Sequence, residues 1–347
     1  MFGTLRLLLA FMVVLSHLPG SDYLVHFGFY AVCGFFVLSG FLMTTGLHEV
    51  YRFNAKLFWG NRLLRLLPPY YLVCLLTLLV VIQVPAEAGA YLSYWVSDVP
   101  RYDIALNLLI IPQQWPQLDF RLVPPFWSVA VELQMYALLF FVASRNENFA
   151  LATLWIGGVY HFACIYGGLG FGARYFSAAA ATLAFAAGAL IYFWTKRGAL
   201  NVTSSTAALA LLMWLANTLV SRWLLPDEYA YGPGYYLATF LFVIAVAGLA
   251  SIRWSPLAER IDRMLGEIAY PAFLVQWLAG FLTALAISPG VWRGWSLTFA
   301  SIPLILLMAV GMALLNRRLV EPLRTQLRNT AAAGTQPELK ELPPRSA

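Results

Sequence analysis

The chain contains the stretch WSLTFASIPLILLMAVGMALLN (Trp295–Asn316), in which no residue is charged. A helix needs about 20 consecutive apolar residues to cross a bilayer core of ~30 Å, so this stretch predicts a transmembrane helix. Nine earlier stretches are similar. They lie near residues 4–19, 28–47, 66–85, 125–144, 149–170, 174–195, 202–224, 235–252 and 268–287. The sequence therefore predicts an all-α polytopic membrane protein with about ten transmembrane helices.

Composition supports the same class. Of the 347 residues, 61% are hydrophobic and only 11% are charged, whereas a soluble domain carries about 25% charged residues. This excludes soluble, disordered and fibrous proteins. The three cysteines, Cys33, Cys74 and Cys164, lie in apolar runs without metal-ligand spacing, which argues against a disulfide framework or a zinc site. No basic cluster suggests nucleic-acid binding.

The basic residues predict the orientation of the spans. Of the 22 Lys and Arg residues, 17 fall on the side of the N-terminus, and five fall on the other side. By the positive-inside rule, both termini are expected in the cytoplasm. We expect a membrane domain over residues 1–328, followed by a disordered cytoplasmic tail over 329–347 that is rich in Ala, Pro and Glu.

Ionisable residues inside spans are costly and therefore suggest function. His17 and Glu132 are the main cases, and His161 is a weaker one. Arg6 precedes His17 by 11 residues, which places both side chains on one helix face about 16 Å apart. Glu132 is expected at a depth similar to that of His17. A carboxylate that orients a histidine supports a general base; the alternative is a structural polar pair between helices.

A pair of arginines, Arg62 and Arg65, precedes the third predicted span. Their i, i+3 spacing places both on one helix face, and arginine suits phosphate because its planar fork binds two oxygens. The alternative is ordinary positive-inside flanking. With Arg6, the pair fits a ligand that has phosphates at the cytoplasmic rim and a long arm reaching toward His17. Coenzyme A has this shape.

Two further motifs contain small residues inside spans. In FFVLSGFL (Phe35–Leu42), the pair Ser39-Gly40 allows close approach of another helix or of a thin ligand. In PPFWSVAVE (Pro124–Glu132), Ser128 is suited to helix capping, with a role as a nucleophile as the alternative.

These motifs together resemble the membrane acyltransferase-3 family, the bacterial multi-pass O-acyltransferases of surface glycans. The resemblance is carried by Arg6-x10-His17, FFVLSGFL, FWGNRLLRLLPPY (Phe58–Tyr70), PPFWSVAVE, LGEIAYP (Leu265–Pro271) and VEPLR (Val320–Arg324). It implies transfer of an acyl group, usually acetyl from acetyl-CoA, to a hydroxyl of a glycan or glycoside acceptor. It also implies a place in the bacterial inner membrane and a role in the cell envelope.

The resemblance assigns roles to individual residues. His17 and Glu132 are expected to be catalytic. Arg6, Arg62, Arg65, Ser39 and Gly40 are expected to bind the acyl-CoA, and no metal is expected. Where many relatives have a serine and a histidine in the ninth span, this chain has Ala269 and Gln276.

The sequence leaves the chemical role of the histidine open. The histidine acts either as a general base or through an acyl-histidine intermediate. The aromatic residues of the loop 86–124, among them Tyr91, Trp95 and Trp115, are expected to offer a surface to the sugar. Two other classes of protein are alternatives: a secondary transporter of an anionic metabolite, which predicts sequence pseudo-repeats, and a non-catalytic scaffold for glycan assembly.

Overall fold

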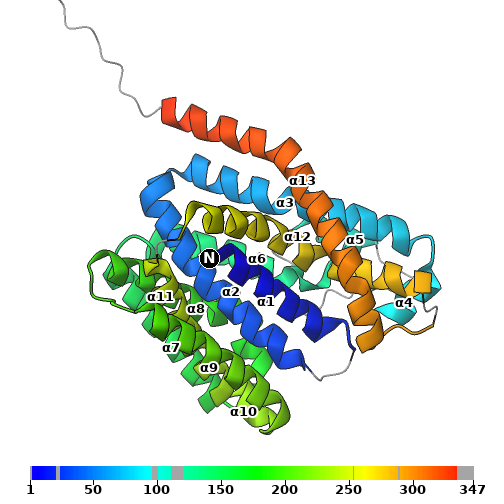
Figure 1. Ribbon diagram of the computed structural model, residues 1–347, viewed down its shortest axis with the longest axis horizontal. Helices are drawn as coiled ribbons and strands as arrows, with labels where there is room; N and C mark the ends of the chain where they lie inside the picture. Colours follow the sequence, from blue (N-terminus) through cyan, green and yellow to red (C-terminus); the bar gives the residue numbers. More distant parts are fainter. Residues whose placement is uncertain are drawn as a thin grey trace, which may run out of the picture.

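The computed structural model describes residues 2–20, 24–95, 101–110, 120–252, 254–287 and 290–333, and these form helices and connecting turns without any β-strand (Figure 1). The α-helices are α1 (Phe2–His17), α2 (Val25–Gly46), α3 (Ala55–Val81), α4 (Pro85–Tyr91), α5 (Arg101–Leu108), α6 (Trp127–Leu138), α7 (Glu147–Tyr166), α8 (Ala178–Lys196), α9 (Ser204–Trp223), α10 (Asp227–Tyr231), α11 (Pro233–Ser251), α12 (Pro256–Ile287) and α13 (Trp295–Ala333). Within these described residues, nine helices are long and apolar enough to cross a membrane, and α1 is a shorter apolar helix. The predicted all-α polytopic membrane class is confirmed.

Several helices extend beyond the predicted spans. The third begins at Ala55 rather than near 66, so Pro68 and Pro69 lie inside α3. Helix α12 begins at Pro256, and α13 continues to Ala333. The apolar stretch marks only the part of a helix that fits the bilayer, whereas backbone hydrogen bonds continue through the charged turns beside it.

The extension of α13 corrects the predicted start of the tail at residue 329, because the helix still includes 329–333. The rest of the predicted tail, 334–347, lies outside the described residues. The last turns of α13 run along the start of α3 (Figure 1), where Leu327 packs against Gly60.

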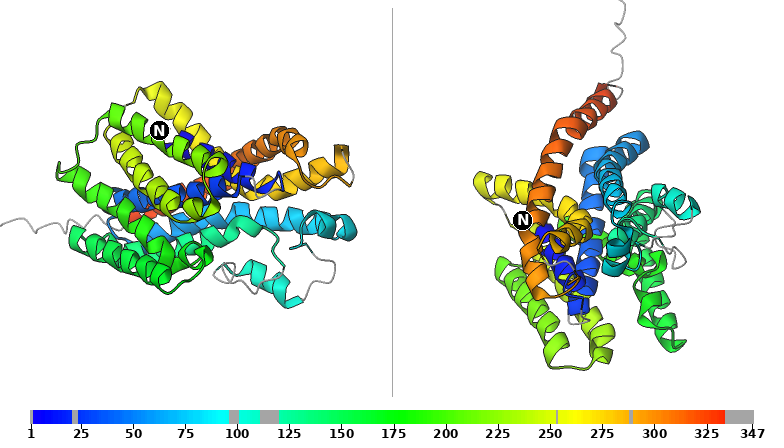
Figure 2. Two further views of the ribbon diagram at one scale, coloured as in Figure 1. Left: turned by 90° about the horizontal axis from the view of Figure 1, so that it is seen from below. Right: turned by 90° about the vertical axis from the view of Figure 1, so that its right-hand side faces the viewer.

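The whole length of α1 lies against α12 (Figures 1 and 2). Gly3 packs on Gly266 at one end and Leu18 packs on Gly280 at the other, so the two helices are parallel. Asp262 also caps the start of α1, accepting hydrogen bonds from the backbone N–H groups of Gly3 at 2.9 Å and Thr4 at 2.8 Å. A carboxylate at a helix N-terminus is favourable, and these contacts fix the register of α1 against α12.

Helices α2 and α8 approach through two glycines. A Cβ atom at Gly40 would overlap the backbone of Phe185, and one at Gly188 would overlap the carbonyl oxygen of Val37. Small residues let two backbones meet in this way inside a membrane. The same contact holds α2 in place, and α2 carries Ser39.

We expect Gly188→Ala to destabilise this packing by about 1–3 kcal/mol, because the added methyl group meets backbone that cannot turn aside. The measurement is the thermal unfolding midpoint of the purified protein in detergent. Gly158→Ala on α7 is the matched control, since a Cβ there has no atom within 4 Å. Equal midpoints for the two variants would contradict the expectation.

Candidate active site

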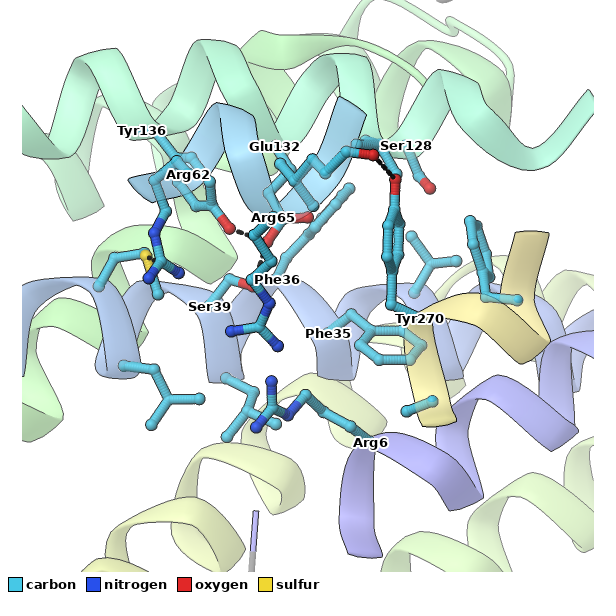
Figure 3. A pocket seen from close by; sticks show the side chains of 18 of the residues that line it. Arg6, Phe35, Phe36, Ser39, Arg62, Arg65, Ser128, Glu132, Tyr136 and Tyr270 are labelled. Atoms are coloured by element: carbon cyan, nitrogen blue, oxygen red, sulfur yellow. Dashed lines mark hydrogen bonds between the residues drawn. The ribbon is translucent and has the colours of Figure 1, made fainter. Parts of the chain in front are cut away.

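A cavity of about 270 Å³ lies between α1, α2, α3, α6 and α12 (Figure 3). Its polar lining residues are Arg6, Ser39, Arg62, Arg65, Ser128, Glu132, Tyr136 and Tyr270, and its aromatic ones include Phe35, Phe36 and Phe273. Arg6, Arg62 and Arg65 thus reach one cavity from α1 and α3, although Arg62 follows Arg6 by 56 residues in the sequence. The arginine cluster expected from the sequence exists as a geometric unit.

Arg62 is held by neutral groups. It is buried, and its Nη2 donates to the Tyr51 hydroxyl at 2.5 Å and to Asn61 Oδ1 at 3.2 Å. Its Nη1 lies 3.4 Å from Met43 Sδ. Asn61 Oδ1 also accepts from Arg324 Nη2 of α13 at 2.8 Å. These contacts fix Arg62 and bring a further arginine to the same region.

Arg6 and Arg65 face each other across the cavity (Figure 3). Arg6 Nε donates to the carbonyl oxygen of Phe2 at 3.2 Å, and Arg65 makes no hydrogen bond or ion pair to any residue in the described part of the chain. The two half-buried guanidinium groups form no direct salt bridge among the described residues and repel each other, and the repulsion grows as water is excluded. An anion placed between them would remove this repulsion and bind both forks.

Glu132 is bonded to hydroxyl groups. Its Oε1 accepts from Ser39 Oγ at 2.6 Å and from the Tyr136 hydroxyl at 2.5 Å. Tyr136 follows Glu132 by one helical turn of α6, whereas Ser39 comes from α2. The carboxylate therefore joins α2 to α6 at the wall of the cavity.

His17 lies at the end of α1 beside a second, smaller cavity of about 100 Å³. Its Nδ1 lies 3.1 Å from Gln276 Oε1, and its ring stacks on Trp277 at 5.4 Å between centroids. Ser128 and Phe273 line both this cavity and the central one, which places the two cavities side by side. Aromatic rings dominate the smaller cavity: Phe29, Trp127, Tyr175, Phe176 and Phe273.

A family model described as an acyltransferase domain matches residues 3–315, nearly the whole chain. The chain belongs to the membrane acyltransferase-3 family. The match covers every residue that lines the central and the smaller cavity, and it identifies the protein as a membrane O-acyltransferase. No curated protein and no solved structure matches the chain.

The predicted contact between Glu132 and His17 in this acyltransferase is wrong. Among the described residues, His17 bonds to Gln276, and Glu132 bonds to Ser39 and Tyr136. Helix rise gives the depth of a residue in the membrane, but it does not give the direction in which a side chain points around the helix axis. Depth alone therefore could not pair these two residues.

The expected ligand contact of Gly40 is also corrected. Gly40 faces the backbone of Phe185 and does not line the cavity, whereas Ser39 does. Neighbouring helical residues point about 100° apart, and here Ser39 turns toward the cavity while Gly40 turns toward α8. Close helix packing accounts for Gly40.

Two further residues of the acyltransferase site, Tyr136 and Gln276, were not predicted from the sequence. Tyr136 stands at i+4 from Glu132, a spacing that predicts contact on a helix surface. Gln276 was noticed only as a departure from the family pattern. The expected capping role of Ser128 is wrong: its hydroxyl donates to the Pro125 carbonyl oxygen at 3.0 Å, and no side chain caps the start of α6, whereas a capping side chain accepts from a backbone N–H.

Among the described aromatic residues of the loop 86–124, Tyr94 and Tyr102 are exposed, whereas the others are buried. Tyr91 and Trp95 are buried and pack against Phe281 of α12. Burial raises the pKa of the Tyr91 hydroxyl, so this ring packs as a neutral group. Trp115 lies outside the described residues. The aromatic lining near His17 comes instead from α2, α12 and the segments around Trp127 and Tyr175.

Proposed function

We propose that this acyltransferase uses an acyl-CoA, most simply acetyl-CoA, to acylate a hydroxyl group of a cell-surface or secreted glycan from the bacterial inner membrane. The observation that carries the proposal is the facing pair Arg6 and Arg65, neither of which forms a salt bridge to a carboxylate among the described residues. Such a pair suits a phosphorylated ligand, because each guanidinium can bind two phosphate oxygens.

A route for the donor is supported by a third cavity, of about 830 Å³, which shares Arg6, Arg65, Gly266 and Tyr270 with the central one. It also contains Arg260, Arg263, Arg317 and Arg324. By the charge distribution of the sequence, this side faces the cytoplasm. The nucleotide phosphates would bind there and at the facing arginines, and the thin pantetheine arm would enter the central cavity.

The reaction would take place where the central and smaller cavities meet. Because α1 is helical from Phe2 to His17, His17 stands about 16 Å along the axis from Arg6. His17 would remove the proton of the acceptor hydroxyl as its oxygen attacks the thioester carbonyl. The C–O bond forms, the C–S bond breaks, and the proton passes from His17 to the leaving thiolate. In the alternative order, His17 first takes the acyl group and then passes it to the hydroxyl.

The remaining site residues would shape the cavity. Ser39 would keep Glu132 in its bonded position, and the carboxylate would provide a fixed negative charge near the arginines. The acceptor would bind beside His17, because the aromatic rings there suit the apolar faces of a sugar. No metal participates in this scheme.

The proposal is tested by expressing the protein in a host that makes several surface glycans. We expect new base-labile acyl esters on a glycan, and acyl-CoA consumption by membranes that contain the protein. Membranes with Gly158→Ala should behave as wild type, and membranes without the protein should give neither signal. Movement of an anionic metabolite across liposomes without ester formation would instead support a transporter.

A further inference from the structure

Gln276 occupies a fully buried position on α12, between His17 and the backbone of its own helix. Its Nε2 donates to the carbonyl oxygen of Phe273 at 2.9 Å, and its Oε1 lies 3.1 Å from His17 Nδ1. Both polar atoms of this side chain therefore have one defined partner each.

These contacts leave one arrangement of hydrogens. The Phe273 carbonyl oxygen only accepts, so the amide nitrogen of Gln276 must face it, and Oε1 must face the histidine. Because Oε1 also only accepts, His17 Nδ1 must carry a hydrogen. In a neutral imidazole the lone pair then belongs to Nε2. His17 Nε2 makes no hydrogen bond to any of the described residues, and His17 lines the smaller cavity.

The imidazole ring of His17 is also held in place by an aromatic ring stacked against its face. Trp277, the next residue on α12, stacks on the imidazole with an interplanar angle of 28°. The Arg293 guanidinium covers Trp277 at 4.6 Å from the ring centroid, and Arg293 Nη2 donates to the Tyr91 carbonyl oxygen at 2.5 Å. The parallel packing of α1 on α12 sets the register in which Gln276 meets His17.

We propose that Gln276 is a positioning residue that keeps His17 in the tautomer with hydrogen on Nδ1, so that Nε2 is the nitrogen available for reaction. The inference rests on the proposed function for its catalytic consequence, whereas the tautomer itself is a property of the resting protein. Gln276 thus fills the supporting position that the sequence assigned to Glu132.

The test combines ¹⁵N-histidine NMR of the full-length protein in lipid nanodiscs with kinetics of the same samples. The chain has four histidines, and His17→Ala identifies the signal of His17. We expect an N–H signal for Nδ1 and a lone-pair signal for Nε2 in wild type and in Gln276→Glu, which keeps an acceptor. Gln276→Met, similar in length without an acceptor at that place, should populate the other tautomer.

In the kinetics, Gln276→Met should lower kcat by about 10- to 10³-fold, within the ~10⁴-fold loss that a wrong tautomer can cause. The KM for acyl-CoA should stay unchanged, and Gln276→Glu should restore most of kcat. Thr283→Ala, a buried hydroxyl deletion on the same helix, is the matched control. Retention of the Nδ1–H tautomer in Gln276→Met would overturn the inference. A tautomer switch without acyl transfer in any sample would uphold it and reject the proposed function.

Discussion

Replacement of His17 by alanine is expected to lower the rate of acyl transfer by about 10²- to 10⁴-fold, the usual contribution of a general base. The affinity for acyl-CoA should stay near that of wild type, because the arginines lie about 16 Å away along α1. The measurement is kcat for ester formation on a soluble glycoside by protein in lipid nanodiscs, with acyl-CoA binding measured on the same samples.

His48→Gln provides a matched control for this prediction. His48 is bonded to the Ser144 carbonyl oxygen at 2.7 Å and lines neither cavity of the site. Its replacement should leave kcat unchanged. If His17→Ala retains wild-type kcat, another group must accept the proton. Mass spectrometry after incubation with acyl-CoA alone separates the two mechanisms, since only the two-step route leaves an acyl group on His17.

The features that can be predicted from the sequence are those that depend on composition and helical periodicity. The all-α membrane fold follows from its apolar stretches, and the common depth of Arg6, Arg62 and Arg65 follows from their position at one end of the spans. These features need only the rise of a helix and the cost of burying charge. Neither requires knowledge of which helices are neighbours.

Contacts that depend on helix rotation could not be predicted. His17 meets Gln276 because Gly3 and Gly266 set α1 against α12, a pairing of helices about 260 residues apart. Ser39 and Gly40 face different neighbours for the same reason. A single sequence gives each helix its polar face but does not say which helix covers it, so the partners of buried polar residues emerge only from the packing.

The facing arginines lead to a prediction in which binding and stability change in opposite directions. Arg65→Gln should raise the KM for acyl-CoA by about 10- to 100-fold, since a hydrogen bond to a charged group contributes ~1.5–3 kcal/mol. The same change removes one of two repelling charges, so the unfolding midpoint of the ligand-free protein should rise. Groups arranged for binding commonly cost stability in this way.

Arg62→Gln is the comparison variant for Arg65→Gln. It also removes an arginine from the cavity, but not one of the facing pair. Arg62 is buried and bonded to Tyr51, Asn61 and Met43, so its loss leaves buried polar groups without partners and should lower the unfolding midpoint by an amount equivalent to about 1–3 kcal/mol. Thermal unfolding in detergent, with and without acyl-CoA, measures both variants. Stabilisation by acyl-CoA should be large for wild type and small for Arg65→Gln. An Arg65→Gln protein that is less stable than wild type yet binds acyl-CoA normally would show that Arg65 supports the fold and does not hold the donor.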